Sequence, residues 1–190
     1  GNSILSPPSG GNGECVSFNS NSENNTVENN YCFNASQNAI YVGSNSNNIA
    51  ILNNTILFPG SAGITKDAIS INGLNNATVS NNFIANASSN GIYLNNVRNV
   101  ILHSNSILNN SHDGITIQSS SYNVTIDDSI MSGNGRFGIY REGSPGGSIN
   151  NNTITNNTIS YSGGEDIKLN GDNNTITNNS ITYCSGYDTN

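Results

Sequence analysis

The tetrapeptide Asn-Asn-Thr-Ile recurs through the second half of the chain. It occurs twice in GSINNNTITNNTISYSGG (residues 147–164) and returns in NNTITNNSITYCSG (residues 173–186). Helices disfavour Asn and the β-branched Thr and Ile, because Asn competes for backbone hydrogen bonds and branched side chains lose rotamer freedom. Thr-Ile favours a strand, whereas paired Asn favours a tight turn that tolerates left-handed backbone angles. The motif therefore predicts strand, corner, strand, corner.

The motif belongs to a longer repeat with a period of 23 to 29 residues. A first apolar column is Val16, Ile40, Ile69, Ile92, Ile115, Ile139 and Ile167. Two residues later stand Phe18, Val42, Ile71, Leu94, Ile117, Arg141 and Leu169. A third column is Cys32, Ile56, Ile84, Ile107, Ile130, Ile159 and Ile181. Two residues before it stand Asn30, Asn54, Asn82, Asn105, Asp128, Asn157 and Asn179. Spacing by two places the first two columns on one face of a strand.

These columns predict a solenoid in which each turn makes three short strands and successive turns stack into parallel sheets. Inward columns then form aliphatic stacks, and the repeated Asn bonds its equivalents in neighbouring coils as a ladder. We predict one all-β domain over residues 1–190, a right-handed parallel β-helix with three sheets and about seven coils, continuing beyond both ends. A stack of Asn-Gly hairpins is the rival, but Gly91 introduces the next inward Ile rather than closing a hairpin.

The segment NGIYLNNVRNVILHSNSILNNSHDGITI (residues 90–117) carries a family resemblance. It is similar to the parallel β-helix repeats of the NosD-type, carbohydrate-binding and sugar-hydrolase group within the pectate-lyase-like superfamily. The resemblance implies the right-handed β-helix over nearly the whole chain. It leaves the activity open, because that superfamily includes lyases, hydrolases, epimerases, binding modules, adhesins and structural surface proteins.

Composition excludes several classes of partner. Asn makes up 41 of the 190 residues, only 9% are charged, and five Lys plus Arg leave a net charge of −7. This balance argues against binding nucleic acid or an anionic membrane surface. No apolar run is long enough to span a bilayer. We expect no cofactor and no metal. Paired acids such as Asp127 and Asp128 are poor metal ligands here, because Asp128 is expected to serve in the Asn column.

Three cysteines are present, at positions 15, 32 and 184. Their spacing does not match a zinc motif. A disulfide between Cys15 and Cys32 within one coil is one alternative. A free, buried thiol at Cys32, acting as a small apolar side chain, is the other.

Sequons for N-glycosylation are dense. The candidates are Asn24, Asn34, Asn76, Asn86, Asn109, Asn123, Asn151 and Asn173. Some sequons arise by chance in a chain rich in Asn, Ser and Thr, but Asn34, Asn86 and Asn109 recur at one corner after the third strand and predict a row of glycans. Sequon density, few Lys, no initiator Met and the family resemblance together predict an extracellular or cell-surface location.

Residues that point outward from the first strand suggest a carbohydrate site. Tyr41, Tyr93 and Tyr140 share one outward column, which predicts binding of saccharides. A second column expected to face outward, two residues before the first apolar column, is Glu14, Asn38, Asp67, Asn90, Asp113, Phe137 and Glu165. His112, Asp113 and Arg136 come near Tyr140 in two successive coils. Such a set resembles the base and charge clamp that lyases and epimerases of uronates need. The Asp-Pro-His motif of alginate epimerases and the calcium-binding Asp cluster of lyases are absent, so catalysis is the weaker reading.

The two ends of the chain favour a different main function. Residues 1–5 are already in register with residues 104–108, and neither end carries a capping helix. Uncapped solenoid ends expose strand edges and apolar surface. We therefore predict a surface β-solenoid that stacks end to end with other copies, with polysaccharide binding or modification as the alternative. Insertions at 6–13, 57–65 and 142–148 are predicted to be surface loops.

Overall fold

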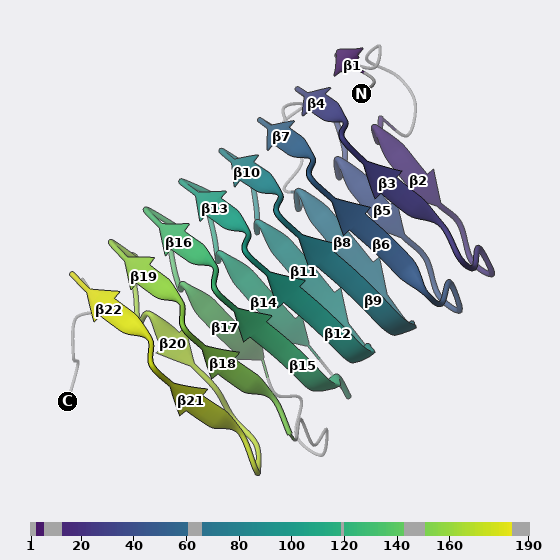
Figure 1. Cartoon of the computed structure of the whole chain (residues 1–190). Helices are drawn as coiled ribbons and strands as arrows, with labels where there is room; N and C mark the ends of the chain where they lie inside the picture. Colours follow the sequence, from purple (N-terminus) through teal and green to yellow (C-terminus); the bar gives the residue numbers. More distant parts are fainter. Residues whose placement is uncertain (1–2, 6–12, 61–65, 119, 143–150, 184–190) are drawn as a thin grey trace.

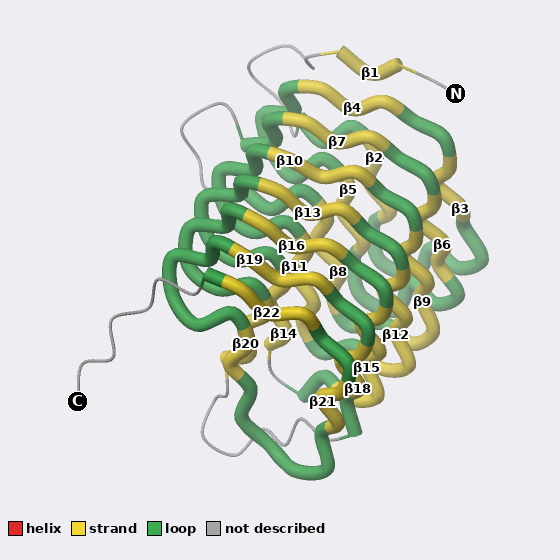
Figure 2. Tube along the Cα trace, turned by 60° about the vertical axis from the view of Figure 1, so that its left-hand side comes forward, coloured by secondary structure: helices red, strands yellow, loops and turns green. Residues whose placement is uncertain are grey.

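The computed structural model describes residues 3–5, 13–60, 66–118, 120–142 and 151–183. These residues wind into a right-handed β-helix in which three parallel sheets surround one apolar interior (Figures 1 and 2). The three-sheet architecture predicted from the sequence is confirmed. The insertion loops lie mostly outside the described residues, and Cys184 lies wholly outside them.

Each coil contributes one strand to each sheet. Sheet A contains β1 (Ser3–Leu5), β4 (Tyr31–Phe33), β7 (Thr55–Leu57), β10 (Phe83–Ala85), β13 (Ser106–Leu108), β16 (Ile130–Ser132), β19 (Thr158–Ser160) and β22 (Ser180–Thr182). Sheet B contains β2 (Val16–Phe18), β5 (Ile40–Val42), β8 (Ile69–Asn72), β11 (Ile92–Asn95), β14 (Ile115–Gln118), β17 (Ile139–Glu142) and β20 (Ile167–Lys168). Sheet C contains β3 (Thr26–Glu28), β6 (Ile49–Leu52), β9 (Asn75–Ser80), β12 (Arg98–His103), β15 (Tyr122–Asp127), β18 (Thr153–Thr155) and β21 (Thr175–Thr177).

The pairing register stacks identical positions of successive coils. In sheet B, Ile92 pairs with Ile69 on one side and with Ile115 on the other, and all three side chains are fully buried. In sheet A, Ile84 pairs in the same way with Ile56 and Ile107. The inward columns therefore form the continuous aliphatic stacks that the repeat predicts, and stacking removes this apolar surface from water.

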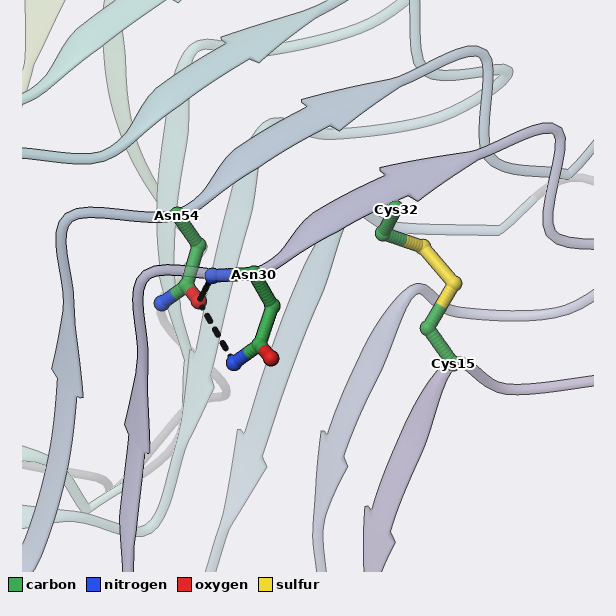
Figure 3. Close-up of a disulfide and its surroundings, with 4 residues drawn as sticks. All are labelled: Cys15, Asn30, Cys32 and Asn54. Carbon is green, nitrogen blue, oxygen red and sulfur yellow. Dashed lines mark hydrogen bonds between the residues drawn. A yellow bond between two sulfur atoms is a disulfide. The ribbon is translucent and has the colours of Figure 1, made fainter. Parts of the chain in front are cut away.

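A buried ladder of Asn side chains runs along the corner between sheets C and A. The Asn54 backbone N–H and Nδ2 both donate to Asn82 Oδ1 at 3.0 Å. Asn82 repeats the arrangement on Asn105 Oδ1, at 3.1 and 3.0 Å. Figure 3 shows the first rung, in which the Asn30 N–H and Nδ2 bond Asn54 Oδ1. Each side chain thus satisfies backbone groups that a tight corner would otherwise leave buried and unpaired.

One coil departs from the predicted columns by one residue. Met131, not Ile130, pairs with Ile107 and is fully buried, whereas Ile130 is 47% exposed. Likewise Ser129, not Asp128, occupies the ladder rung, and its Oγ accepts the Asn105 N–H at 3.1 Å. Asp128 is the left-handed residue just before it. The sequence prediction is wrong at Asp128 and Ile130, because Asp can occupy either a ladder rung or a left-handed corner. The backbone register of this coil places the serine, Ser129, on the rung.

Three long columns of left-handed residues run along the helix, one at each side of sheet C and one after sheet A, and a shorter fourth column of Asn21, Asn45, Gly73 and Asn96 follows sheet B. The first column is Asn24, Asn48, Asn76, Asn99, Asn123, Asn151 and Asn173. The second is Asn29, Asn53, Asn81, Ser104, Asp128, Asn156 and Asn178. The third is Asn34, Phe58, Asn86, Asn109, Gly133, Tyr161 and Tyr183. Asn dominates because its short side chain tolerates positive φ, which explains much of its abundance.

A disulfide joins Cys15 to Cys32 with their Cα atoms 6.1 Å apart (Figure 3). Cys15 directly precedes β2, and Cys32 is the inward residue of β4. The bond therefore ties sheets B and A together across the interior. Of the two sequence alternatives, the structure shows the disulfide rather than the free thiol.

Candidate functional site

The outer face of sheet B carries the three predicted tyrosines. Tyr41, Tyr93 and Tyr140 alternate along the column with the smaller residues Ser70 and Thr116. Each tyrosine is half-buried, and the smaller residues between them are almost fully buried. The tyrosines are two strand spacings apart, about 10 Å. The structure thus gives a row of aromatic rings parallel to the helix axis, with the Tyr93 hydroxyl donating to Gln118 Oε1.

A second polar ladder runs beside this row, where the sequence predicts outward residues. The Asp67 N–H donates to Asn38 Oδ1 at 3.0 Å, and the Asn90 N–H and Nδ2 donate to Asp67 Oδ1 at 3.1 and 2.9 Å. The Asp113 N–H then donates to Asn90 Oδ1 at 3.1 Å. Asn38, Asn90 and Asp113 are buried. The expectation that this column faces solvent is therefore wrong for these residues, since the corner between sheets A and B contains its own ladder.

Asp113 marks the end of this ladder and is only 2% exposed. Its Oδ2 accepts the Thr116 hydroxyl at 2.7 Å, and its Oδ1 accepts the Phe137 N–H at 3.3 Å. Arg136 Nε lies 3.7 Å from Oδ1. The carboxylate is thus engaged inside the fold, and its cationic contact among the described residues is Arg136, whose side chain is 47% exposed.

Arg136, Phe137, Tyr140 and Lys168 form a compact surface group, called here the aromatic–cationic patch. The Phe137 and Tyr140 rings stack with centroids 4.5 Å apart and planes 13° apart. The guanidinium carbon of Arg136 lies 5.3 Å from both ring centroids, and Lys168 Nζ lies 5.2 Å from that of Phe137. Lys168 also pairs with Glu165 at 3.0 Å. Cations near ring faces are attracted by the ring quadrupole, which holds the patch together.

His112 neighbours this patch through the backbone. The Arg136 N–H donates to the His112 carbonyl at 3.0 Å, so the two residues occupy equivalent positions in successive coils. The imidazole Nδ1 lies 3.5 Å from Ser89 Oγ. Of the four predicted catalytic residues, Arg136 contacts the side chains of both Asp113 and Tyr140, whereas its contact with His112 is through the backbone.

Burial perturbs two ionisable groups near this face. Desolvation raises the pKa of the Asp67 carboxyl, against the opposing effect of its hydrogen bonds from Asn90 and Ser89. Arg141 occupies an inward position, where burial lowers the pKa of its guanidinium. In the part of the chain that the structure describes, no three His, Cys, Asp or Glu side chains are placed to hold a metal ion. Nor do those residues contain a helix long and apolar enough to cross a membrane.

The predicted glycosylation sites lie in two of the left-handed columns. Asn24, Asn76, Asn123, Asn151 and Asn173 belong to the first column, and Asn34, Asn86 and Asn109 belong to the third. In the first column Asn48 Nδ2 donates to Asn24 Oδ1, and this pattern repeats up to Asn123 and Asn99. A strand Thr stands two residues after each of these first-column sites, and a Ser stands two residues after each of these third-column sites, so the repeat itself creates the sequons. Use of these sites remains a prediction.

The sequence matches the family model described as right handed beta helix region over residues 61–181. The chain belongs to the right-handed β-helix family. The finer likeness to NosD-type repeats stays a prediction. Among proteins of curated function, no sequence matches this β-helix.

Solved structures share this fold at low sequence identity. The periplasmic alginate epimerase AlgG superposes with a TM-score of 0.72 at 15% identity, over 88% of this chain and 42% of that chain. Pectate lyase Pel9A gives 0.65 at 14%, over 92% and 52%. PfbA, a surface adhesin of Streptococcus pneumoniae, gives 0.57 at 13%, over 90% and 62%. This β-helix therefore spans about half the length of its structural neighbours, and the likeness establishes the fold alone.

Sequence reasoning missed the importance of Phe137 and Lys168. In the column of Phe137 the other coils place Asn, Asp or Glu, and in that of Lys168 they place Ser, Thr or Tyr. The sequence could have indicated this role for Phe137, because a bulky aromatic side chain in a polar column cannot form the side-chain hydrogen bonds of the ladder.

Proposed function

We propose that this β-helix is a polysaccharide-binding module that engages acidic glycans along the outer face of sheet B, with the aromatic–cationic patch as its centre. The observation that carries the proposal is the stacked Phe137–Tyr140 pair flanked by Arg136 and Lys168. Ring faces pack against the apolar faces of sugars, and a guanidinium binds a carboxylate through two parallel hydrogen bonds.

The arrangement along the face supports an extended ligand. Tyr93 and Tyr140 repeat along the helix axis with Thr116 between them, so alternate coils offer a polymer contacts of one kind. The structural neighbours that act on alginate and pectate, and the adhesin, are in keeping with a carbohydrate ligand. Since Asp113 is buried and hydrogen-bonded, the candidate catalytic set lacks an exposed carboxylate base, and binding is favoured over turnover.

Binding is tested by titrating the purified chain with oligomers of mannuronate and galacturonate, with a neutral glucan for comparison. We expect Tyr140→Ala and Arg136→Ala each to weaken uronate binding at least tenfold. Tyr122→Ala is the matched control, because Tyr122 also lies under an arginine, Arg98 at 4.9 Å, but on sheet C. Uronate binding that survives both patch substitutions, or that is lost equally in the control, contradicts the proposal. Rising ultraviolet absorbance from unsaturated ends, abolished by His112→Ala, would instead establish a lyase.

End-to-end assembly is the second candidate, favoured by one observation. The last described strands expose interior-column residues, with Ile176 49% and Ile181 47% exposed. Further coils or a second copy would bury them in the same way. We expect filaments of the native protein in electron microscopy, shortened by Ile181→Asp. Monomeric rods at all concentrations contradict assembly.

We propose an extracellular or cell-envelope location. The Cys15–Cys32 disulfide is typical of oxidising compartments. Two of the structural neighbours are described as periplasmic and as a surface adhesin. Fractionation of source cells followed by immunodetection tests the location.

A further inference from the structure

Ser104, His103 and Asp127 form a connected hydrogen-bonded chain at the corner between sheets C and A. Ser104 Oγ lies 3.0 Å from His103 Nε2, and His103 Nδ1 lies 3.2 Å from Asp127 Oδ2. His103 ends β12 and Asp127 ends β15, and these strands are neighbours in sheet C (Figure 1). The sequence interval of 24 residues is one turn of the solenoid, so the fold itself brings the acid beside the base.

The order of these contacts is that of an activated nucleophile. When Nδ1 donates to the Asp127 carboxylate, Nε2 is left as an acceptor for the serine hydroxyl. A hydroxyl bonded to a base that is itself oriented by an acid is the arrangement that makes serine reactive in acyl transfer. Asp127 is held in turn by the next coil, because Asn156 Nδ2 donates to its Oδ1 at 3.0 Å.

Ser104 is also an exception within its column. All seven residues of the second left-handed column have positive φ, and the others are Asn or Asp, which tolerate that conformation. Ser104 has a φ of 53°, in a region that serine enters less readily. A polar residue held in a sparsely populated conformation at a surface corner points to a functional role.

The surroundings leave the hydroxyl accessible. Ser104 is half-buried, and the His103 and Asp127 side chains are 45% and 29% exposed. Ser104 Oγ also donates to Asp128 Oδ2 at 3.2 Å, so this carboxylate competes with the imidazole, at 3.0 Å, for the hydroxyl proton.

We propose that Ser104, His103 and Asp127 form an acyl-transfer site that hydrolyses short acyl esters. Ser104 Oγ attacks the carbonyl carbon while His103 Nε2 takes the hydroxyl proton. The bond to the alcohol oxygen breaks, and the imidazolium returns the proton to the leaving alcohol. Water then attacks the acyl-serine through the same base, which releases the carboxylic acid and regenerates the serine. Asp127 is a positioning residue that orients the imidazole. This site lies on sheet C and is independent of the aromatic–cationic patch on sheet B.

The test uses the full chain with p-nitrophenyl acetate and with a fluorophosphonate probe. We expect hydrolysis above background and probe attached to the peptide that contains Ser104. Ser104→Asn should abolish both, and this substitution keeps the fold because Asn is the usual residue of the column. His103→Ala should slow hydrolysis about 100-fold, with added imidazole restoring part of it. Asp127→Asn should lose the activity and Asp127→Glu should retain part.

The chain supplies an internal control. Ser89 Oγ lies 3.5 Å from His112 Nδ1, a longer contact to a histidine whose ring has no carboxylate partner among the interactions of the described residues. We expect the probe to leave Ser89 unlabelled in the same sample. Three results would overturn the assignment. The first is that the unsubstituted chain hydrolyses the ester no faster than Ser104→Asn. The others are that the probe still labels Ser104 in His103→Ala, or that it labels Ser89 and Ser104 equally. Binding of uronates is unaffected in every one of these outcomes, so the two proposals fail separately.

Discussion

The Asn ladder makes the sharpest prediction about stability, and Asn82 is the rung on which to test it. The Asn82 side chain is 1% exposed and bonds in both directions along the helix. Its Oδ1 accepts the N–H and the Nδ2 of Asn54, and its Nδ2 donates to the Ile51 carbonyl at 2.9 Å and to Asn105 Oδ1 at 3.0 Å. Replacing Asn82 by Ala, Ser or Asp removes different members of this set of hydrogen bonds.

Asn82→Ala removes all of these side-chain bonds and leaves the Asn54 N–H buried with no acceptor. One orphaned buried donor costs about 1–3 kcal/mol, and the lost bond to Ile51 adds about 1 kcal/mol, so we expect about 3 kcal/mol. Asn82→Ser keeps an acceptor for the Asn54 N–H, as Ser129 already does for Asn105, and should cost only about 1–2 kcal/mol. Asn82→Asp should cost most, because the second carboxylate oxygen would face the Ile51 carbonyl and Asn105 Oδ1 instead of donating to them.

The assay is urea unfolding followed by circular dichroism, with Asn30→Ala as the control in the same column. Asn30 forms the first rung, where its Nδ2 donates to Asn54 Oδ1 and to the Glu28 carbonyl and its own Oδ1 does not support a further described rung. Its removal should cost no more than about 1 kcal/mol. The expected order of destabilisation is Asp, Ala, Ser. Two results would show that the ladder does not stabilise the fold by accepting the Asn54 N–H. One is a loss of unfolding free energy as large for serine as for alanine, and the other is the smallest loss for aspartate.

Three further predictions concern cross-linking, protonation and modification. Replacing Cys15 and Cys32 by Ser should lower the free energy of unfolding by about 3 kcal/mol for their separation of 17 residues, and a denaturant midpoint unmoved by reductant would contradict this. Because burial raises the pKa of Asp67, the folded state holds that proton more tightly, so stability should fall as pH rises above the ordinary pKa. Asp67→Asn should abolish that slope and raise the melting temperature at pH 7. Peptide mass spectrometry of native material should find hexose on left-handed Asn such as Asn76; uniformly unmodified peptides would end the glycan prediction.

The interior could be predicted from the sequence because its positions are redundant. Ile92 and Ile115 are related by the same period as Asn82 and Asn105, so several columns confirm one register. The prediction was wrong at Ser129 and Met131, because two columns of this coil carry residue types that differ from the other coils and no longer indicate one register. When one column of a coil carries an unusual residue, the other columns still indicate the register of that coil. When two neighbouring columns do so, only the backbone structure shows the register.

The site was harder to predict, because its contacts depend on the corner between sheets A and B. The sequence groups His112, Asp113, Arg136 and Tyr140, and in the structure Arg136 contacts both Asp113 and Tyr140. The burial of Asp113 could not be anticipated, since it follows from the ladder of Asn38, Asp67 and Asn90 that this longer corner forms in three dimensions.

A solenoid separates the residues that stabilise it from those free to act, and this separation suggests where to look for function. Inward Ile and corner Asn repeat because each must match the coil before and after it. Outward positions carry no such demand, so a departure from the column average there is not explained by folding. Phe137, which stacks on Tyr140 where other coils place a ladder residue, and Ser104, which lies beside His103 where other coils place Asn or Asp, are departures at two corners that folding does not explain either. The two groups occupy different sheets, so one β-helix can bind a polymer on one face and present a reactive hydroxyl on another without either site constraining the core.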